Sequence, residues 1–313
     1  MERIVFLDRQ SLKVEVRRPS FSHVWEEHDH TAETLVVSRL AGATVAITNK
    51  VPIRRASLEQ LPALKMIAIA ATGYDVIDID ACRERGIAVA NIRNYAVHTV
   101  PEHTFAMIFA LRRNLIAYRE DVLRGRWQSQ DQFCFFDHPI QDLHGSTMGI
   151  FGEGVLGQAT AALARALGMR VLFADHPPPK APNVEFTDPE TVLAQSDIIS
   201  LHCPLTPASR NFIGIEQFKK MKRSAILINT ARGPVVDEEA LATALQQGKI
   251  AGAGLDVFEK EPTVHQALIG LDNAVLIPHL GSATVETRTA MANLAVTNAL
   301  AVLSGKTAPN LVG

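Results

Sequence analysis

The chain has 313 residues, which is more than one hydrophobic core usually holds, so we expect two domains. Its composition is ordinary for a globular protein, and its 31 lysines and arginines nearly balance 33 aspartates and glutamates. The formal net charge of -2 offers no footprint for nucleic acid or for an anionic membrane surface, so we expect neither as a partner.

Two further features of the sequence narrow the class of protein. No window reaches the roughly 18 apolar residues of a membrane span, and the N-terminus MERIVFLDRQ predicts a strand rather than a signal peptide. The cysteines, Cys82, Cys134 and Cys203, lie too far apart for a metal knuckle or a disulfide framework. We therefore expect a cytoplasmic protein without a metal site, acting on small molecules.

Short β-branched runs alternate with helical patterns along the first hundred residues, which is typical of a parallel α/β fold. The predicted strands are residues 4–7, 44–48, 66–70 and 87–90. Between the last two, the segment VIDIDACRERG predicts a helix that ends at Gly86. Residues 100–120 carry apolar side chains at helical spacing, so we expect one long helix packed between domains or subunits.

Stronger strands follow from residue 147 onward. They are predicted at residues 147–152, 170–175, 197–202, 225–230, 251–257 and 274–279. Six strands in series, with helices between most of them, are typical of a complete doubly wound parallel sheet. A final helix is predicted at residues 285–305, beyond the last strand.

A glycine-rich motif, GEGVLG, lies between the strand at residues 147–151 and an alanine-rich helix. Gly152, Gly154 and Gly157 have the G-x-G-x-x-G spacing of a dinucleotide-binding loop. Gly152 permits the tight turn, Gly154 lets the backbone approach a pyrophosphate, and Gly157 lets the helix pack closely on the strand. Glycine triplets also occur by chance and in plain turns, but the strand and helix on either side favour a bound dinucleotide.

An aspartate ends the next predicted strand. Asp175 lies 18 residues after Gly157 (175 minus 157), close to the spacing at which an acidic residue binds the adenosine ribose diol. A carboxylate there favours NAD and repels the 2'-phosphate of NADP. The alternatives are a helix-capping or turn aspartate, and His176 and Lys180 nearby leave room for NADP.

Three chemically distinct side chains follow three separate predicted strands: Arg232, Glu261 and His279. Each residue taken alone has a structural alternative. Arg232 could be a surface turn residue, Glu261 a loop carboxylate before a proline, and His279 a core histidine at a strand end. Because the carboxyl ends of parallel strands meet at one edge of a sheet, we expect the three to converge at the ligand crevice. Their joint presence favours a catalytic site.

The motifs GEGVLG, LHCPLTPASRNFIG, NTARGPVVDEEAL, GLDVFEKEP and PHLGSAT resemble the D-isomer-specific 2-hydroxyacid dehydrogenases in both residues and order. The resemblance implies two Rossmann-like or flavodoxin-like parallel-sheet domains. An NAD domain, residues 99–285, would be inserted into a discontinuous substrate domain, residues 1–98 and 286–313. The family also implies a homodimer.

The resemblance assigns roles residue by residue. His279 is the proton donor and acceptor, Glu261 its partner, and Arg232 a substrate-binding cation. The backbone amides of residues 71–74 hold the substrate carboxylate; these are Ala71, Thr72, Gly73 and Tyr74. The nicotinamide side is lined by Thr104, Cys203, Thr230, Ala231 and Asp256, and further cofactor contacts fall on Val155, Leu156, His202, Pro204 and Gly281 together with Arg232 and His279.

The sequence departs from the usual family pattern at two positions. Pro101 replaces the usual alanine, and Glu153 stands between the first two glycines, where an inward carboxylate would weaken cofactor binding. Neither changes a reacting group.

The segments ATGYDVIDIDACRERGIAVANIRNYAVHTVPEHTF and FCFFDHPIQDLHG are most similar to the glycerate dehydrogenase, or hydroxypyruvate reductase, branch. Glyoxylate, D-lactate and bulkier acids stay open as substrates, because spacing does not reveal the side-chain pocket. A non-enzymatic NADH-sensing scaffold is the alternative from another class. Glu261 argues against formate dehydrogenase, and the end at Gly313 against the long phosphoglycerate dehydrogenases. The cluster Phe133, Phe135 and Phe136 is expected in a core or dimer contact, with the partner's substrate mouth as the lesser alternative.

Overall fold

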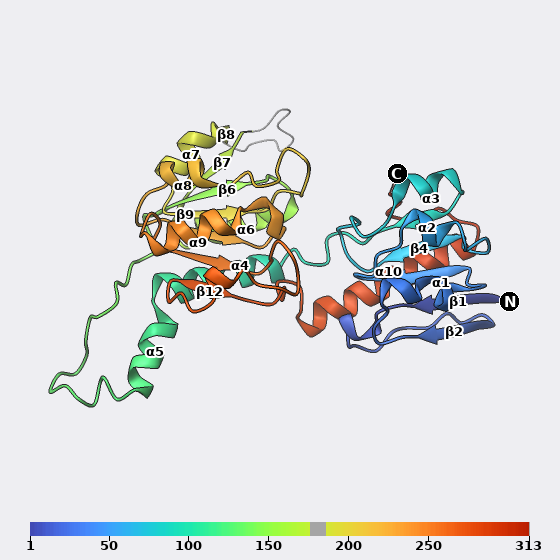
Figure 1. The fold of residues 1–313 in the computed structure, drawn as a ribbon, viewed down its shortest axis with the longest axis horizontal. Helices are drawn as coiled ribbons and strands as arrows, with labels where there is room; N and C mark the ends of the chain where they lie inside the picture. The colour runs from blue at the N-terminus through green and yellow to red at the C-terminus, as the bar shows by residue number, and fades with distance from the viewer. Residues whose placement is uncertain (176–185, 313) are drawn as a thin grey trace. The chain divides into compact units, whose positions relative to one another are not determined.

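The computed structural model describes residues 1–175 and 186–312. The chain forms two compact units, one made of Met1–Ala96 with Ala283–Gly313 and the other of Val97–Ser282. Each unit has its own parallel sheet (Figure 1), and each has its own hydrophobic core. The described chain therefore has the predicted α/β fold class, with two parallel-sheet domains.

The sheet of the first unit has the strand order β2-β1-β3-β4-β5, all parallel, which is the order of flavodoxin-like folds. Its strands are β1 (Glu2–Phe6), β2 (His23–Glu27), β3 (Val45–Thr48), β4 (Met66–Ile69) and β5 (Ala88–Ala90). The four predicted strands are confirmed to within one or two residues at each end. The edge strand β2 was not predicted, because its sequence HVWEE ends in two charged residues and lacks an apolar run.

Alternate residues of these strands enter two different cores. Val5 of β1 faces the cluster that also contains residues of helices α1 (Val36–Leu40), α2 (Arg55–Leu58) and α3 (Ile79–Glu84). Ile4, its neighbour, faces α10 (Val285–Leu303). The last helix of the chain thus covers one face of the first sheet, and the unit is discontinuous in sequence.

The sheet of the second unit has the order β12-β11-β10-β9-β6-β7-β8, again all parallel. Its strands are β6 (Thr147–Phe151), β7 (Arg170–Ala174), β8 (Phe186–Thr187), β9 (Ile198–Leu201), β10 (Ile226–Asn229), β11 (Gly252–Leu255) and β12 (Ala274–Leu276). The six predicted strands are confirmed, and β8 adds a short edge. The strand order reverses between β6 and β9, which is where doubly wound sheets bind ligands.

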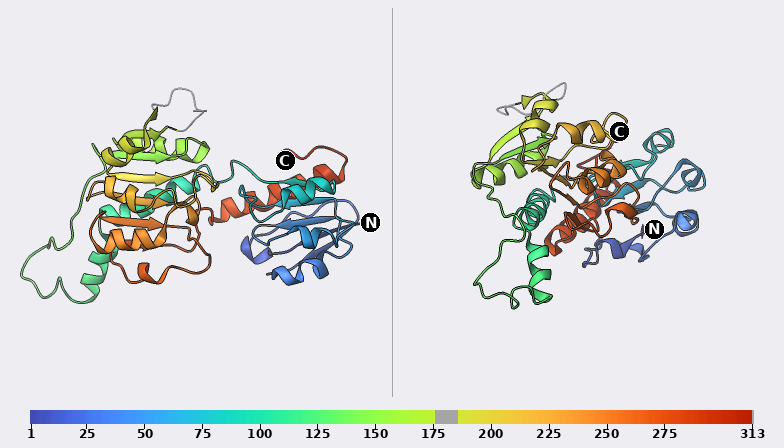
Figure 2. Two further views of the ribbon diagram at one scale, coloured as in Figure 1. Left: turned by 45° about the horizontal axis from the view of Figure 1, so that its top comes forward. Right: turned by 60° about the vertical axis from the view of Figure 1, so that its left-hand side comes forward.

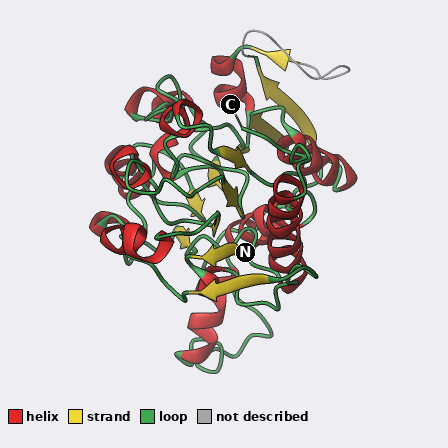
Figure 3. Ribbon diagram, turned by 90° about the vertical axis from the view of Figure 1, so that its right-hand side faces the viewer, coloured by secondary structure: helices red, strands yellow, loops and turns green. Residues whose placement is uncertain are grey.

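Helices pack on both faces of this second sheet, and Figure 3 distinguishes helices, strands and loops by colour. One face packs on α4 (Thr99–Arg112) and α6 (Val155–Ala166), and the other on α7 (Pro189–Gln195), α8 (Ile215–Lys220) and α9 (Glu238–Gln246). Short 3-10 turns occur as η1 (Arg9–Ser11), η2 (Glu33–Leu35), η3 (Gly233–Val235) and η4 (Gln266–Leu268). Among the described helices, none is both long and apolar enough to cross a membrane.

The single helix predicted over residues 100–120 is wrong. Two helices, α4 and α5 (Leu115–Leu123), meet at Asn114, whose backbone is left-handed with φ of 48°. Asparagine tolerates this conformation, and its side chain donates a hydrogen bond of 2.5 Å to the carbonyl of Pro139. The apolar pattern continues through the break and conceals it. α5 and the segment after it project from the body of the second unit (Figures 1 and 2).

Candidate active site

Three neighbouring strands of the second unit deliver the predicted catalytic residues. Arg232 follows β10, Glu261 follows β11 and His279 follows β12, and β11 lies between the other two. All three strands are parallel, so their carboxyl ends share one edge. The loop after β10 packs tightly on the loop after β11: a Cβ atom on Gly233 would lie 1.8 Å from the carbonyl carbon of Phe258.

His279 and Glu261 form a hydrogen-bonded pair. Nδ1 of His279 lies 2.8 Å from Oε2 and 3.0 Å from Oε1 of Glu261. The amide of Phe258 donates to Oε1 of the same carboxylate at 3.3 Å. With Nδ1 engaged, Nε2 is the ring atom left to exchange a proton with a ligand. Both side chains are partly exposed, at 29% for His279 and 37% for Glu261.

The backbone at His279 has an unusual conformation. Its φ is 53°, in the left-handed region that non-glycine residues rarely adopt, and its amide donates to the carbonyl of Asp256 at 2.8 Å. The buried Asp256 carboxylate accepts the next two amides, those of Leu280 at 2.6 Å and Gly281 at 2.9 Å. Strained backbone of this kind persists where the surroundings fix it, and it clusters at functional sites.

Arg232 is held by a local network at the end of β10. The side chain of Asn229 donates to the carbonyl of Arg232 at 3.0 Å and accepts the amide of Ala231 at 3.0 Å. The guanidinium donates to the carbonyl of Ala231 at 2.7 Å. Thr230, beside them, lies 3.4 Å from Thr104 of α4 through their hydroxyl oxygens. Asn229 therefore positions the backbone of Ala231 and Arg232. The sequence does not indicate this function, because a polar residue at the end of a predicted strand is common.

The glycine loop has the shape that a dinucleotide requires. Gly152 has φ of 109°, and a Cβ there would lie 2.6 Å from the carbonyl of His202. A Cβ on Gly157 would lie 2.0 Å from the carbonyl oxygen of Gly152. Gly154 has nothing within 4 Å of its Cβ position and caps the N-terminus of α6, where Val155 and Leu156 begin the helix. Two glycines are thus demanded by packing, and the third leaves open space at a helix N-terminus.

The residues after β9 lie next to the glycine loop. Nε2 of His202 lies 2.9 Å from the Ser200 hydroxyl, whereas Nδ1 is buried and has no hydrogen-bond partner among the described residues. Burial lowers the pKa of His202 to about 4, so its ring is neutral at pH 7. Burial also raises the pKa of the Cys203 thiol to about 11, which leaves it unreactive, and Pro204 follows it. The unsatisfied Nδ1 of His202, beside the glycine loop, fits a site that binds a dinucleotide.

The two acidic residues expected to affect cofactor binding differ in exposure. Asp175 is exposed at the end of β7, and its amide donates to the carbonyl of Thr187 at 2.7 Å. Glu153 is buried, with 6% of its surface exposed. His176 and Lys180, on which the NADP alternative was based, lie outside the described residues.

The predicted carboxylate-binding loop belongs to the first unit and follows β4. The side-chain amide of Asn91 donates a hydrogen bond to the carbonyl of Thr72 at 2.7 Å. The Thr72 hydroxyl donates to the carbonyl of Ile92 at 3.0 Å. In the part of the chain that the structure describes, none of the backbone amides of residues 71–74 donates a hydrogen bond. These amides are available to an anion.

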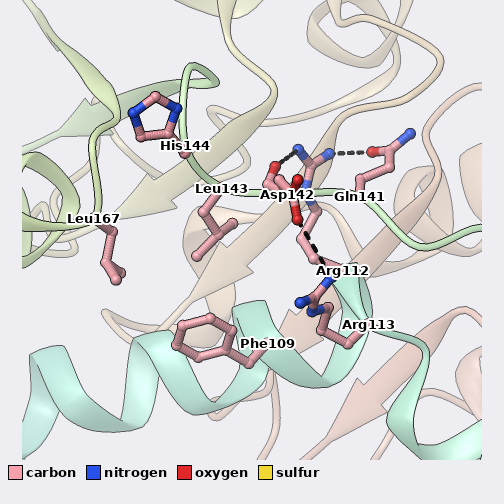
Figure 4. A pocket seen from close by; sticks show the side chains of 8 residues that line it. All are labelled: Phe109, Arg112, Arg113, Gln141, Asp142, Leu143, His144 and Leu167. Carbon is pink, nitrogen blue, oxygen red and sulfur yellow. Dashed lines mark hydrogen bonds and ion pairs between the residues drawn. The ribbon is translucent and has the colours of Figure 1, made fainter.

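A separate cavity of about 230 Å³ lies in the second unit, away from these residues (Figure 4). Its lining comes from α4, the segment before β6 and the residue after α6: Phe109, Arg112, Arg113, Gln141, Asp142, Leu143, His144 and Leu167. The buried Arg112 donates to the carbonyl of Asp142 at 2.8 Å, and burial lowers its pKa. This hydrogen bond connects the segment before β6 to α4.

Comparison with known proteins decides the family. The model of the D-isomer specific 2-hydroxyacid dehydrogenase NAD binding domain matches residues 105–281, which contain the glycine loop and all three strand-end residues. The chain belongs to this family of oxidoreductases. Among individual relatives, the glycerate dehydrogenase of Methylorubrum extorquens is 50% identical over 309 residues, and the match covers 97% of each chain.

Other relatives of this dehydrogenase bear related names. The glyoxylate reductase of Thermococcus litoralis is 43% identical over 274 residues, covering 85% of this chain and 81% of the relative. Among solved structures, the NADPH-dependent glyoxylate/hydroxypyruvate reductase of Sinorhizobium meliloti superposes with a TM-score of 0.87 at 29% identity, covering 100% of this chain and 98% of the other.

Proposed function

We propose that this D-2-hydroxyacid dehydrogenase reduces hydroxypyruvate to D-glycerate reversibly, with glyoxylate as a second substrate. The observation that carries the chemistry is the His279–Glu261 pair at the edge shared with Arg232. Support for the substrate comes from the relative in Methylorubrum extorquens, a glycerate dehydrogenase at 50% identity. D-lactate and bulkier acids are the alternatives that the assay below separates.

Each site residue has a distinct part in the proposed mechanism. When bound, the reduced nicotinamide supplies the hydride that adds to C2 of the 2-oxo acid. Protonated His279 donates from Nε2 to the developing alkoxide, and the Glu261 carboxylate balances the charge of the imidazolium. Arg232 binds the substrate carboxylate and polarises the carbonyl group.

We also propose that the first unit is the substrate domain, as the boundaries predicted at residues 98 and 286 imply. The free amides of Ala71, Thr72, Gly73 and Tyr74 would bind the substrate carboxylate, because successive backbone N–H groups form a favourable anion site. The second unit would hold the dinucleotide through Gly154, the N-terminus of α6 and the unsatisfied ring atom of His202.

NAD is the proposed cofactor rather than NADP. The exposed carboxylate of Asp175 suits a ribose diol and opposes a 2'-phosphate. The Sinorhizobium meliloti neighbour is NADPH-dependent, so the choice needs a direct test. Asp175→Ser should lower the ratio of kcat/KM with NADH to kcat/KM with NADPH by about tenfold or more. A wild-type enzyme that prefers NADPH would contradict the assignment of NAD.

One assay tests the function and the cofactor together. Oxidation of NADH and of NADPH is followed with hydroxypyruvate, glyoxylate, pyruvate and phenylpyruvate. We expect the highest kcat/KM with hydroxypyruvate and NADH. A preference for pyruvate or phenylpyruvate would replace the proposed substrate, and the absence of oxidation with all four acids would favour the NADH-sensing scaffold.

A homodimer is proposed through the projecting segment of the second unit. α5 and the residues after it expose a run of large apolar side chains: Leu115, Ile116, Val122, Leu123, Trp127, Phe133, Phe136 and Ile140. Exposed patches of this extent mark association sites. Ile116→Glu should give a monomer in analytical ultracentrifugation, whereas Ile215→Glu on α8, also exposed, should not. A monomeric wild type would refute the dimer.

We also propose a cytoplasmic location, on the basis of how the chain uses its cysteines. Cys82, Cys134 and Cys203 are all free thiols in the described residues, which suits a reducing compartment.

A further inference from the structure

The buried Asp256 carboxylate organises the turn that carries His279, and it has a partner on a distant helix. Nε2 of His103, on α4, lies 3.1 Å from Oδ1 of Asp256. The two residues are 153 positions apart. The carboxylate thus receives three hydrogen bonds, from the amides of Leu280 and Gly281 and from the ring of His103.

The need for such a partner follows from burial. The Asp256 side chain is only 3% exposed, and a buried carboxylate is unfavourable unless it is fully hydrogen-bonded or paired with a charge. Within the described part of the chain, His103 is the one titratable side chain that forms a hydrogen bond or ion pair with it. Removing that contact leaves the carboxylate with only the two turn amides as donors to its oxygens.

The turn itself has little freedom to adjust. A Cβ on Gly281 would lie 2.8 Å from Oδ2 of Asp256, so the carboxylate sits directly against this residue. The Thr99 hydroxyl of α4 also lies 3.4 Å from the Gly281 carbonyl oxygen. The first turns of α4 therefore hold the carboxylate and the glycine from one side, while the carboxylate holds the backbone next to the left-handed His279.

We infer that His103 is a positioning residue for the catalytic histidine, acting through Asp256 on the turn at residues 279–281. This inference rests on the proposed role of His279. Without the His103 contact, Asp256 shifts or turns, the two amides lose their fixed acceptor, and the His279 ring is no longer held in the geometry for proton transfer. A misplacement of about 1 Å at a reacting group costs on the order of 100-fold in rate.

The test compares three variants at this position. His103→Gln keeps an amide nitrogen near the place of Nε2, whereas His103→Leu has no donor and His103→Asn is too short to reach. We expect Leu and Asn to lower kcat about 10- to 100-fold with KM nearly unchanged, because the proton is donated only in the transition state. Gln should restore most of the rate. Glu102→Gln, an exposed neighbour on α4, is the matched control.

A second readout does not depend on turnover. Hydrogen exchange at the amides of Leu280 and Gly281 should be faster in His103→Leu and His103→Asn than in the wild type and His103→Gln. If Leu fails to fold, the comparison of Asn with Gln decides. Equal rates in Asn and Gln, or unchanged amide protection in both Leu and Asn, would overturn the inference. A wild type inactive on every acid would refute the proposed function, while the exchange measurement would still test His103.

Discussion

The carboxylate of Glu261 lies 2.8 Å from Nδ1 of His279, although 18 residues and one strand separate them in sequence. The pair forms because β11 and β12 are adjacent and parallel, so the loops that follow them start at the same edge. A carboxylate on Nδ1 fixes the orientation of the ring and leaves Nε2 to donate the proton.

The charge of Glu261 should matter more than its hydrogen bond. Glu261→Gln keeps an acceptor for Nδ1 and removes the anion, so we expect kcat to fall about 10- to 100-fold, less than the loss on removing the acid itself. Affinity for NADH, measured by fluorescence titration, should not change. Glu259→Gln, exposed in the same loop, is the control. A Glu261→Gln enzyme with the wild-type kcat would remove Glu261 from the mechanism.

The planar fork of Arg232 should be needed for the 2-oxo acid. Arg232→Lys replaces two parallel donors by a point charge, and a hydrogen bond to a charged group contributes about 1.5–3 kcal/mol. We therefore expect KM for the acid to rise roughly tenfold or more in steady-state assays. The exposed Arg223→Lys should have the wild-type KM. An unchanged KM in Arg232→Lys would show that the arginine does not bind substrate.

The three glycines of the loop should respond differently to alanine. Gly157→Ala places a Cβ 2.0 Å from a backbone oxygen, so we expect the free energy of unfolding to fall by about 1–3 kcal/mol. Gly154→Ala meets nothing within 4 Å and should keep the wild-type Tm, yet weaken NADH binding. Thermal melts and fluorescence titrations measure both effects. Normal NADH affinity in Gly154→Ala would place the pyrophosphate elsewhere.

An ion pair at the start of the second sheet should make stability depend on acid pH. Burial raises the pKa of Asp197, but hydrogen bonds from Lys222 at 2.8 Å and from the amide of Thr147 at 2.9 Å outweigh it and lower the pKa below its usual 3.8. The folded state therefore gains stability above pH 3.8 and loses it as pH falls through the lowered pKa.

Lys222→Met removes the largest of the effects that lower this pKa. Urea unfolding should show the variant less stable than the wild type at pH 7, with the difference shrinking below about pH 4. Lys219→Met, whose exposed pair with Glu216 lies on α8, should show little difference at either pH. A difference for Lys222→Met that stays constant down to pH 3 would contradict the assigned cause.

Sequence patterns predicted the features that depend on local residue type. Short apolar runs indicate most strands of the two sheets, but not the edge strands β2 and β8. The strand-end positions of Arg232, Glu261 and His279 follow from parallel strands sharing an edge. The break at Asn114 was missed because one left-handed residue interrupts a continuous apolar pattern. The contact between His103 and Asp256 was beyond reach, since it depends on the packing of α4 against the end of β11.

His279 is the proposed acid of a 2-oxo acid reductase, and His279→Gln removes that acid while the rest of the site stays in place. Glutamine preserves size and polarity but donates no proton in this pH range, so NADH should bind with the wild-type Kd while kcat with hydroxypyruvate falls by about 10²- to 10⁴-fold. A variant that binds NADH normally and turns over hydroxypyruvate at the wild-type rate would show that His279 is not the acid.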